Sequence, residues 1–440
     1  MAPDLRVAYV TAGGAGMFCG SCMRDNTLVA AVRKLGCDAL LVPTFTPITT
    51  DEPQVTEDRV FLGGINVYLE QKWPFMRRLP QPLRRALDSP RLLSWISKLA
   101  LETRRDEDAA VAVSLLRGEY GNQRAEIDDL VRWLANDVRP DVVNLTNLLI
   151  SGFVPALKRL RDVPVLVTLQ GDDVFLDALP EEGRDAVLRE MRNVAKAIDG
   201  FVVFSRYYRD FMASLLDVPV ERFRLVPMGL ADPASFARGA EPPRAQSMTI
   251  GYLARICPHK GFHVLVDAFL RLRAMPGTEG ARLRAAGWLG RTDLAFFEEQ
   301  RRKLAAAGAL GVFEHADVPD RESKIRFLHG LDVLSVPTIY REPKGIYVLE
   351  ALAAGVPVVV PAHGAFPELL EGTGGGRLVE PGDPERLAVA LHELLLDPAA
   401  RAQLAADGQR RVHERFDAEA MARRTLDVWS EYARPVARPT

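Results

Sequence analysis

The chain has 440 residues, 48% of them hydrophobic, and its mean hydropathy of −0.02 indicates a folded globular protein and excludes a largely disordered one. Its net charge of −2 gives no strongly basic surface, so the composition indicates no nucleic-acid partner. No run of about eighteen apolar residues occurs and no signal-peptide pattern precedes the first apolar segment, so we expect neither a membrane span nor secretion.

Strand-like and helix-like segments alternate through the first half of the chain. The first strand is expected at residues 6–11, and a helix with one apolar face follows at residues 27–35. Further strands are expected at residues 39–42, 141–144, 165–168, 200–204 and 223–226. This alternation predicts an α/β domain with a mostly parallel sheet.

A glycine-rich loop that contains Gly14 and Gly16 follows the first expected strand, where α/β folds bind phosphates or sugars. Cys19 stands where a dinucleotide-binding loop has its third glycine. The second strand ends in Val42-Pro43, without the acid that would bind a ribose. These differences argue against an NAD site. We expect Gly14 and Gly16 to let the backbone approach a donor ligand closely.

Cys19 and Cys22 follow this loop at the start of the expected helix. They would suit a redox pair, half of a metal site, or two small residues that pack in a tight turn. No second cysteine pair is present to complete a metal site. The chain has four cysteines, too few for a disulfide framework, and we expect a reducing, cytoplasmic compartment.

Residues 72–105 interrupt the alternating pattern with nine basic residues against two acidic ones, interleaved with aromatic and aliphatic residues. Such a segment suits peripheral contact with an anionic membrane, or a cover over a lipid-linked substrate. It equally suits a helical insertion, over residues 72–118, that packs its apolar side on the first domain.

Residues 231–247 have the composition of a linker, and the alternation then begins again. Strands are expected at residues 248–253, 283–286, 312–314, 332–336 and 356–360. We therefore expect one α/β domain over residues 1–235 and a second over residues 245–416. A terminal helix within residues 417–440 is expected to pack back on the first domain.

Two basic and two acidic residues in the second half suit a sugar nucleotide. Arg255 and Lys260 are expected on one strand-to-helix turn at the carboxyl edge of the sheet, where a guanidinium and an ammonium suit a diphosphate. Glu342 precedes a short expected helix and Glu350 lies about two turns inside it. Taken singly, each of these residues would also suit an ordinary exposed or half-buried position.

These motifs together resemble the retaining glycosyltransferases of family 4, which have the GT-B fold. The residues concerned are Gly251, Arg255 and Lys260-Gly261, then Glu342 and Glu350 seven residues apart, within Gly345…Glu350-Ala-Leu-Ala-Ala-Gly355-Val-Pro-Val. The resemblance covers nearly the full chain. It implies two Rossmann-like parallel-sheet domains that face each other across a cleft, with the acceptor on the first and the nucleotide sugar on the second.

The resemblance also implies roles for individual residues. Arg255 and Lys260 would hold the donor diphosphate and Glu342 the donor sugar, and these three would be the catalytic residues. Glu350 would hold the ribose, and the other donor-binding residues would be Lys344, Gly345, Ile346, His315 and Val318. It implies no metal ion and no cofactor besides the donor, which would be a UDP sugar or, alternatively, a GDP or ADP sugar.

The chain departs from the family pattern at two places. All seven histidines lie at or beyond His259, which argues against an inverting mechanism with a histidine base in the first domain. Where family members often carry histidine in that domain, this chain places Asn147, Gln170 and Asp172, which become acceptor-side candidates. Lys344 replaces an aromatic residue, and its charge suggests an acidic donor sugar.

Two other functions remain open at this level. A sugar-nucleotide epimerase or hydrolase would need the same phosphate-binding residues but no acceptor. A non-catalytic or redox-regulated binding protein of the same fold would act through Cys19 and Cys22. The sequence does not identify the acceptor, which would be a small molecule or a lipid-linked sugar, nor the oligomeric state.

Overall fold

The computed structural model describes residues 5–13, 20–46, 48, 50, 52–57, 105–238 and 248–434. Gly14, Gly16 and Cys19 lie outside the described residues, as does the basic segment up to residue 104. The predictions made for these positions therefore stay predictions.

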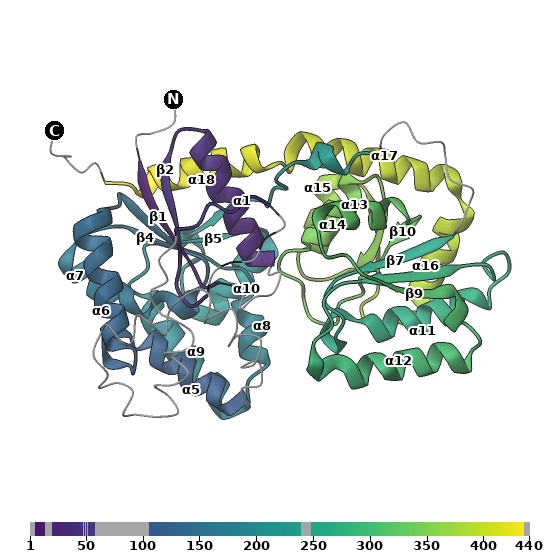
Figure 1. The fold of residues 1–440 in the computed structure, drawn as a ribbon, viewed down its shortest axis with the longest axis horizontal. Coiled ribbons are helices and arrows are strands. Elements are labelled where there is room, and N and C mark those ends of the chain that lie inside the picture. The colour runs from purple at the N-terminus through teal and green to yellow at the C-terminus, as the bar shows by residue number, and fades with distance from the viewer. Residues whose placement is uncertain are drawn as a thin grey trace. The chain divides into compact units, whose positions relative to one another are not determined.

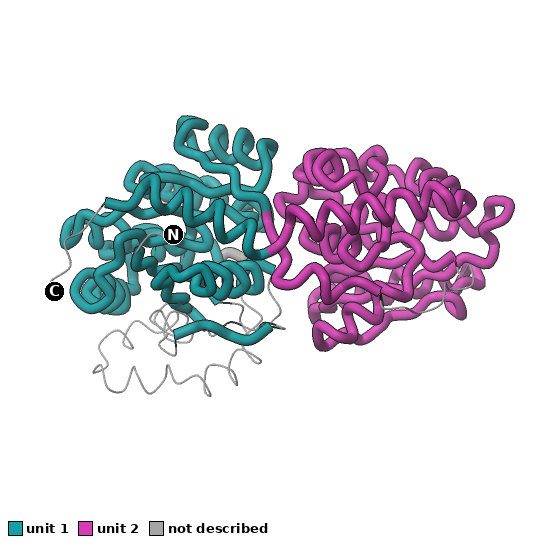
Figure 2. The backbone as a smooth tube through the Cα atoms, turned by 90° about the horizontal axis from the view of Figure 1, so that it is seen from above, with its two compact units in different colours: residues 1–227, 418–440 teal, residues 228–417 magenta. Residues whose placement is uncertain are grey.

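The chain divides into two compact units, coloured separately in Figure 2. Unit 1 comprises Met1–Pro227 and Ala418–Thr440, and unit 2 comprises Met228–Asp417. The sequence places its domain bounds at residues 235, 245 and 416, close to these divisions. Unit 2 is thus continuous in the chain, whereas unit 1 is built from two separate segments.

A six-stranded parallel sheet forms the centre of unit 1, in the order β2-β1-β3-β4-β5-β6. Its strands are β1 (Arg6–Thr11), β2 (Asp38–Pro43), β3 (Val142–Leu145), β4 (Val165–Thr168), β5 (Gly200–Val203) and β6 (Phe223–Leu225). The central strands are rich in valine and fully buried, as parallel strands covered on both faces usually are. The order reverses between β1 and β3, because the chain adds β2 on one side of β1 and then continues on the other.

Helices cover both faces of this sheet (Figure 1). Val7 and Tyr9 of β1 face a core shared with α1 (Gly20–Lys34) and α18 (Ala418–Tyr432). Ala8 and Val10 alternate with them and face the opposite core. The helices of that second core are α5 (Arg105–Leu116), α6 (Arg124–Arg132), α7 (Val154–Leu160), α8 (Asp172–Asp177), α9 (Glu181–Ala195) and α10 (Arg206–Leu216).

The last helix, α18, lies beside α1 although almost 400 residues separate them in the chain (Figure 1). Its Trp429 is fully buried and donates a hydrogen bond from Nε1 to Oδ1 of Asn144 on β3, at 3.0 Å. The indole also packs against Tyr9, with 6.4 Å between the ring centroids. This helix therefore completes one core of unit 1.

Unit 2 repeats the plan with a second parallel sheet, in the order β12-β11-β10-β7-β8-β9. Its strands are β7 (Thr249–Leu253), β8 (Arg282–Ala286), β9 (Phe313–Ala316), β10 (Val333–Leu334), β11 (Val358–Pro361) and β12 (Gly376–Val379). Its helices are α11 (Phe262–Arg273), α12 (Leu294–Ala306), α13 (Arg321–His329), α14 (Ile346–Ala353), α15 (Phe366–Thr373), α16 (Pro384–Leu396) and α17 (Pro398–Arg415). Here the order reverses between β7 and β10.

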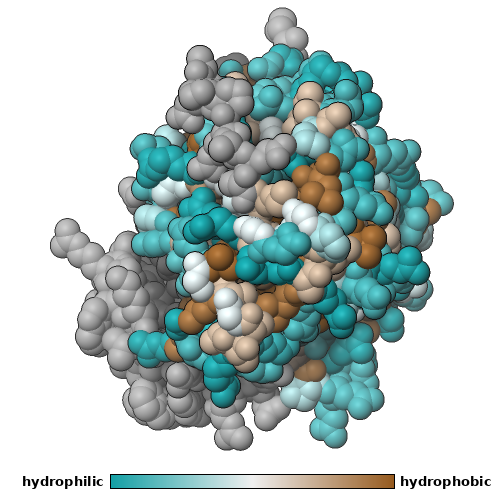
Figure 3. Space-filling view, turned by 90° about the vertical axis from the view of Figure 1, so that its right-hand side faces the viewer, coloured by the Kyte–Doolittle hydropathy of each residue, from teal (hydrophilic) through white to brown (hydrophobic). Residues whose placement is uncertain are grey.

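The two parallel sheets confirm the predicted α/β class with two Rossmann-like halves. The strand expected at residues 332–336 is shorter than predicted, because its ladder ends at Leu334 and the chain then enters a loop that contains Pro337. Within the described ranges no helix is long and apolar enough to cross a membrane. The face of the molecule in Figure 3 carries mostly hydrophilic side chains, with apolar ones in small groups.

Candidate functional site

A buried ion pair marks the strand reversal in unit 2. Lys260 lies in the turn after β7 and Glu342 in the loop after β10, and these two strands are neighbours in the sheet. Crevices at the carboxyl ends of parallel strands, where the strand order reverses, are the usual ligand sites of such sheets. Lys260 Nζ lies 2.5 Å from Glu342 Oε2, although 82 residues separate them in the chain.

Gly261 fixes the position of Lys260. It joins the short turn Pro258–Lys260 to α11 with a φ of 72°, in the left-handed region that favours glycine. A Cβ at this position would lie 1.7 Å from the carbonyl oxygen of Pro337, so no larger residue fits. The turn is also tied to the loop after β10 by a hydrogen bond from Ile339 N to His259 O, at 3.0 Å.

Two tyrosines complete the surroundings of Glu342. Its Oε2 accepts hydrogen bonds from the hydroxyls of Tyr340, at 2.8 Å, and Tyr347, at 3.1 Å. Lys260 Nζ lies about equally close to the two rings, 5.0 and 5.2 Å from their centroids. The other oxygen, Oε1, accepts from the backbone N–H of Lys344 at 3.4 Å. The ammonium and the carboxylate are thus held in an aromatic, hydrogen-bonded enclosure.

This enclosure keeps Glu342 ionised although its exposed fraction is only 2%. Burial by itself raises the pKa of a carboxyl group. The charge of Lys260 and the hydrogen bonds of Lys260 and Tyr340 outweigh burial, and the charge of Lys344 adds to them. Together they lower the pKa of Glu342 to about 2.

The backbone of Glu342 is fixed by the loop after β11. Ala365 N donates to Glu342 O at 2.8 Å. Gly364 has a φ of 62°, and a Cβ there would approach Glu342 N and O to 2.6 Å. Close backbone packing therefore requires glycine at this point and holds the carboxylate in place.

Helix α14 begins directly after this loop. Gly345 precedes it with a φ of 72°, and Ile346 is its first residue. The N–H groups at the start of a helix have no partner within the helix and suit an oxygen-rich ligand. Glu350, the second acid of the motif, is 6% exposed, and its Oε1 lies 2.7 Å from Nζ of Lys324 on α13.

Arg255, at the end of β7, lies beside residues that follow β8. Its Nη2 donates to Oδ2 of Asp293 at 3.0 Å, and its guanidinium lies over the ring of Trp288, 5.1 Å from the centroid. About half of the Arg255 side chain, 52%, is exposed to solvent.

The remaining predicted donor residues, His315 and Val318, lie on β9 or just after it. His315 is exposed on β9, and its ring lies 5.0 Å from that of Phe297. Val318 comes two residues after the end of β9. The predicted residues of unit 2 thus follow β10 and β7 or lie on and just after β9, and those three strands together with β8 are consecutive in the sheet.

Sequence reasoning missed five residues of this site: Tyr340, Tyr347, Lys324, Asp293 and Trp288. Tyr347 lies inside the motif that the sequence analysis quoted, so its position was a usable signal. Tyr340 lies only two residues before Glu342, which is also a local position. Lys324, Asp293 and Trp288 meet the predicted residues only when separate elements pack together, and no local pattern reveals that.

The acceptor-side candidates of unit 1 have structural partners. Oδ1 of Asn147 accepts from Ile150 N at 3.3 Å and caps a short helix, Leu148–Phe153. Asp172 accepts from Leu148 N at 2.7 Å and from Gln170 N at 3.2 Å, and burial raises its pKa to about 6. Gln170 differs from these two, because its side chain joins a buried polar cluster.

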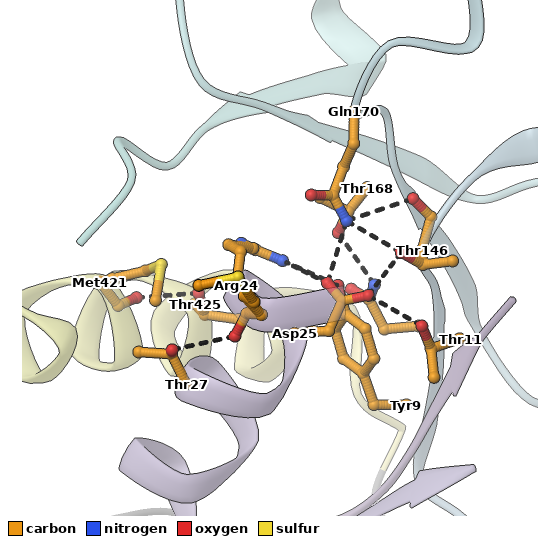
Figure 4. Close-up of polar contacts among 12 residues, drawn as sticks. Tyr9, Thr11, Arg24, Asp25, Thr27, Thr146, Thr168, Gln170, Met421 and Thr425 are labelled. Atoms are coloured by element: carbon orange, nitrogen blue, oxygen red, sulfur yellow. Dashed lines mark hydrogen bonds and ion pairs between the residues drawn. The ribbon is translucent and has the colours of Figure 1, made fainter. Parts of the chain in front are cut away.

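That cluster centres on Asp25 of α1, a residue that the sequence analysis did not identify (Figure 4). The carboxylate is fully buried and accepts hydrogen bonds from four neutral side chains. They are Tyr9 at 2.9 Å, Thr11 at 3.1 Å, Thr146 at 2.5 Å and Gln170 at 2.9 Å. Arg24, also buried, lies 3.4 Å from the same carboxylate. Thr11 ends β1 and Thr146 follows β3, so this cluster occupies the strand reversal of unit 1.

Neither a metal site nor a redox pair can be assigned from the described residues. Cys22 is buried on α1, while Cys19 lies outside the described ranges. Those ranges contain no group of three or more histidine, cysteine, aspartate or glutamate side chains arranged to hold a metal ion.

Comparison with known proteins agrees with this architecture. Residues 235–411 match the family described as glycosyl transferases group 1. Residues 26–229 match the family described as glycosyl transferase 4-like domain. Each match falls largely within one unit of the structure.

Among individual proteins, the chain is 28% identical to a glycogen synthase of Mycobacterium tuberculosis over 68% of this chain and 71% of that protein. It is also 28% identical to a GDP-mannose-dependent α-(1-6)-phosphatidylinositol monomannoside mannosyltransferase of that organism, over 60% of this chain and 68% of the relative. The fold resembles that of Anabaena HepE, solved in complex with UDP, with a TM-score of 0.68 and 15% identity over 97% of this chain and all of that one. The chain therefore belongs to the glycosyltransferases of the GT-B fold.

Proposed function

We propose that this glycosyltransferase is a retaining, metal-independent enzyme that moves a sugar from a nucleoside diphosphate sugar to an acceptor. In this proposal unit 2 binds the donor and unit 1 the acceptor. The proposal rests above all on the buried pair of Lys260 and Glu342 at the strand reversal of unit 2, with Arg255 on the same strand-to-helix connection as Lys260.

The donor diphosphate is assigned to Arg255 and Lys260. Breaking the bond between the anomeric carbon and the diphosphate places growing negative charge on the leaving oxygen. Two cations near that oxygen stabilise the transition state more than the bound donor, and such differential stabilisation accelerates the reaction. These side chains take the part that a metal ion has in other transferases.

The two acids are assigned to hydroxyl groups of the donor. Glu342 accepts from the sugar, with backbone N–H groups of Gly345 and Ile346 beside it, and Glu350 accepts from the ribose. A carboxylate that stays ionised is a strong hydrogen-bond acceptor, and Lys260 keeps Glu342 in that form.

The low pKa of Glu342 also supports retention. An efficient general base has a pKa near the working pH, and a carboxylate with a pKa of about 2 takes a proton poorly. No histidine precedes His259 in the chain. We therefore propose that the leaving phosphate of the donor deprotonates the acceptor, which attacks the same face of the sugar.

The base and the sugar of the donor are proposed from the similar proteins and from the charge of Lys344. UDP is favoured because it is bound in the structurally similar HepE, while the mannosyltransferase relative is named for GDP-mannose. Lys344 contributes positive charge near Glu342, which supports an acidic sugar. The acceptor is proposed to be a small molecule or a lipid-linked sugar, the latter suggested by the phosphatidylinositol mannoside named for that relative.

The test is a mass-spectrometric screen of UDP, GDP and ADP sugars against candidate acceptors, followed by NMR of the product anomer. We expect a glycosylated product whose anomeric configuration matches that of the donor. Nucleotide release without any acceptor would instead indicate a hydrolase or epimerase. Uronic acid donors that react more slowly than glucose and N-acetylglucosamine donors would refute the acidic donor sugar alone.

A further inference from the structure

The buried cluster around Asp25 fixes one orientation of the Gln170 carboxamide. Nε2 of Gln170 lies 2.9 Å from Asp25 Oδ1 and 3.3 Å from the carbonyl oxygen of Thr146. A carboxylate and a carbonyl oxygen only accept hydrogen bonds, so the atom that faces them must be the NH2 group. The assignment of the two ends of this amide therefore follows from its partners.

With the NH2 group turned inward, Oε1 is left on the other side of the amide. Figure 4 shows this oxygen pointing away from all the dashed contacts of the cluster. It is buried, as Gln170 is only 6% exposed, and no hydrogen bond satisfies it within the described part of the chain. Buried acceptors in native proteins are nearly always paired, so this oxygen calls for a partner that donates.

Arg24 supplies the countercharge that stabilises the buried Asp25 cluster. Its Nη1 donates to the hydroxyl of Tyr9 at 2.7 Å and lies 3.4 Å from Asp25 Oδ1, and the whole side chain is 1% exposed. The guanidinium thus places a positive charge beside the buried carboxylate of Asp25.

The location of the cluster connects it with a ligand. Thr11 ends β1, and Thr146 and Gln170 follow the adjacent strands β3 and β4. All three therefore lie at the carboxyl edge of the sheet, next to its strand reversal. The Asp25 cluster thus lies at the strand reversal of the unit 1 sheet, just as the Lys260–Glu342 pair lies at the strand reversal of the unit 2 sheet.

We propose that Arg24 and Asp25 are positioning residues that lock Gln170 so that its Oε1 accepts a hydrogen bond from a substrate hydroxyl. The proposal rests on the glycosyltransferase function argued above and specifies a neutral, hydroxyl-bearing part of a carbohydrate. A carboxylate cannot donate to Oε1, so acidic groups are excluded from this position. The hydroxyl belongs either to the donor sugar or to the acceptor.

The first test measures discrimination against substrates that lack one hydroxyl. The donor arm compares UDP-glucose with its monodeoxy analogues, and the acceptor arm compares methyl α-glucoside with its monodeoxy analogues. In the wild-type protein we expect one deoxy compound of one arm to lose about 10- to 100-fold in kcat/KM. Gln170→Met is expected to abolish that difference, and the arm concerned identifies the source of the hydroxyl.

A double variant tests the positioning role. Arg24→Met combined with Asp25→Asn removes both charges together, which avoids leaving one buried charge unpaired. We expect it to fold and to reduce the same discrimination. The matched control is Thr425→Val on the neighbouring helix α18. It removes a buried hydrogen bond to the carbonyl oxygen of Met421 on the same helix and no hydrogen bond to Gln170. It should keep the discrimination of the wild type.

NMR of selectively labelled glutamine side chains supplies a readout that needs no turnover. The Gln170 NH2 signal, assigned by its loss in Gln170→Met, should be strongly protected from exchange in the wild type and unprotected in the double variant. If no sugar nucleotide is turned over, the proposed function fails, while this signal still decides the orientation. Equal protection in both proteins, or unchanged discrimination in Gln170→Met, overturns the inference.

Discussion

At the scale of single residues, the surroundings of Glu342 combine deep burial with a charge. It is almost fully buried, carries a charge, and holds one cation and two hydroxyl groups at once. Such an arrangement costs desolvation energy that a purely structural role does not need, which is why residues of this kind concentrate at functional sites.

Replacing Glu342 by glutamine is expected to lower kcat by about 100-fold or more, because Lys260 loses its countercharge and the sugar loses an ionised acceptor. UDP release by steady-state kinetics measures the effect. The control is Glu393→Gln, which breaks only an exposed pair with Arg377 and should leave kcat within about twofold. Equal losses in the two variants would remove Glu342 from the proposed site.

Glu342 should also make stability depend on pH. Its pKa in the folded protein, about 2, lies below the ordinary value of 4.5, so its ionised form stabilises the fold above the ordinary value. That stabilisation is lost as the pH falls toward 2. The advantage of the wild type over Glu342→Gln in free energy of unfolding should shrink by about 2 kcal/mol between pH 6 and pH 3.

Urea denaturation at several pH values measures this advantage. Asp172 has the opposite sign, because burial raises its pKa to about 6 and its ionisation destabilises the fold as the pH rises. It is present in both proteins, so its contribution cancels in the comparison. An advantage that stays constant with pH would show that Lys260 does not hold the carboxylate ionised.

At the scale of elements, each site depends on a turn that follows a strand. The turn between β7 and α11 places Lys260 only because Gly261 has a left-handed backbone and packs against Pro337 O. The residue that supplies chemistry and the residue that supplies geometry are thus adjacent in the chain.

Two glycine variants separate backbone strain from close packing. Gly261 and Gly308 have similar φ angles, 72° and 66°, but a Cβ at Gly308 would meet nothing within 4 Å. Gly308→Ala should cost only the strain of a left-handed alanine, about 1 kcal/mol. Gly261→Ala should cost about 1–3 kcal/mol more and raise KM for the donor. Thermal unfolding and kinetics measure both, and equal costs would contradict the packing argument.

The sequence reveals elements and the residues at their ends better than it reveals partners. Valine-rich strands and glycine stops are local patterns, and their alternation with helical segments predicted the α/β fold with its two sheets. The spacing of Arg255, Lys260, Glu342 and Glu350 is also local, and it carried the resemblance to the GT-B glycosyltransferases. The assignment of those four residues to a donor remains a prediction. Asp25 could not be found in this way, because it lies in the middle of a polar stretch of α1, and its partners outside that helix come from three strands, β1, β3 and β4, and the loops after them. The ion pair of Lys324 with Glu350 likewise forms only when α13 packs beside α14, so the local sequence does not predict it.

At the scale of the whole molecule, the chain leaves unit 1 after Pro227 and returns to it at Ala418. The returning helix contributes Trp429 to a core that also contains β1 and α1. Stability of unit 1 therefore depends on residues at both ends of the described chain.

Trp429→Phe should destabilise unit 1 by about 1–3 kcal/mol, since it leaves Oδ1 of Asn144 buried without its indole donor. Hydrogen exchange of amides in β1 and β3 reports on that unit. Trp288→Phe is the matched control, because Trp288 is 43% exposed in unit 2 and its replacement should leave those amides unchanged. Equal protection in Trp429→Phe and the wild type would contradict this role.

This arrangement has a consequence for biosynthesis. A ribosome releases the polypeptide from its N-terminus onward, so β1 to β6 emerge early while α18 emerges only after all of unit 2 has been translated. Until then the apolar side chains that α18 covers stay exposed to solvent, and chaperones would have a prolonged opportunity to bind them. Unit 1 can therefore complete its folding only after unit 2 has been synthesised.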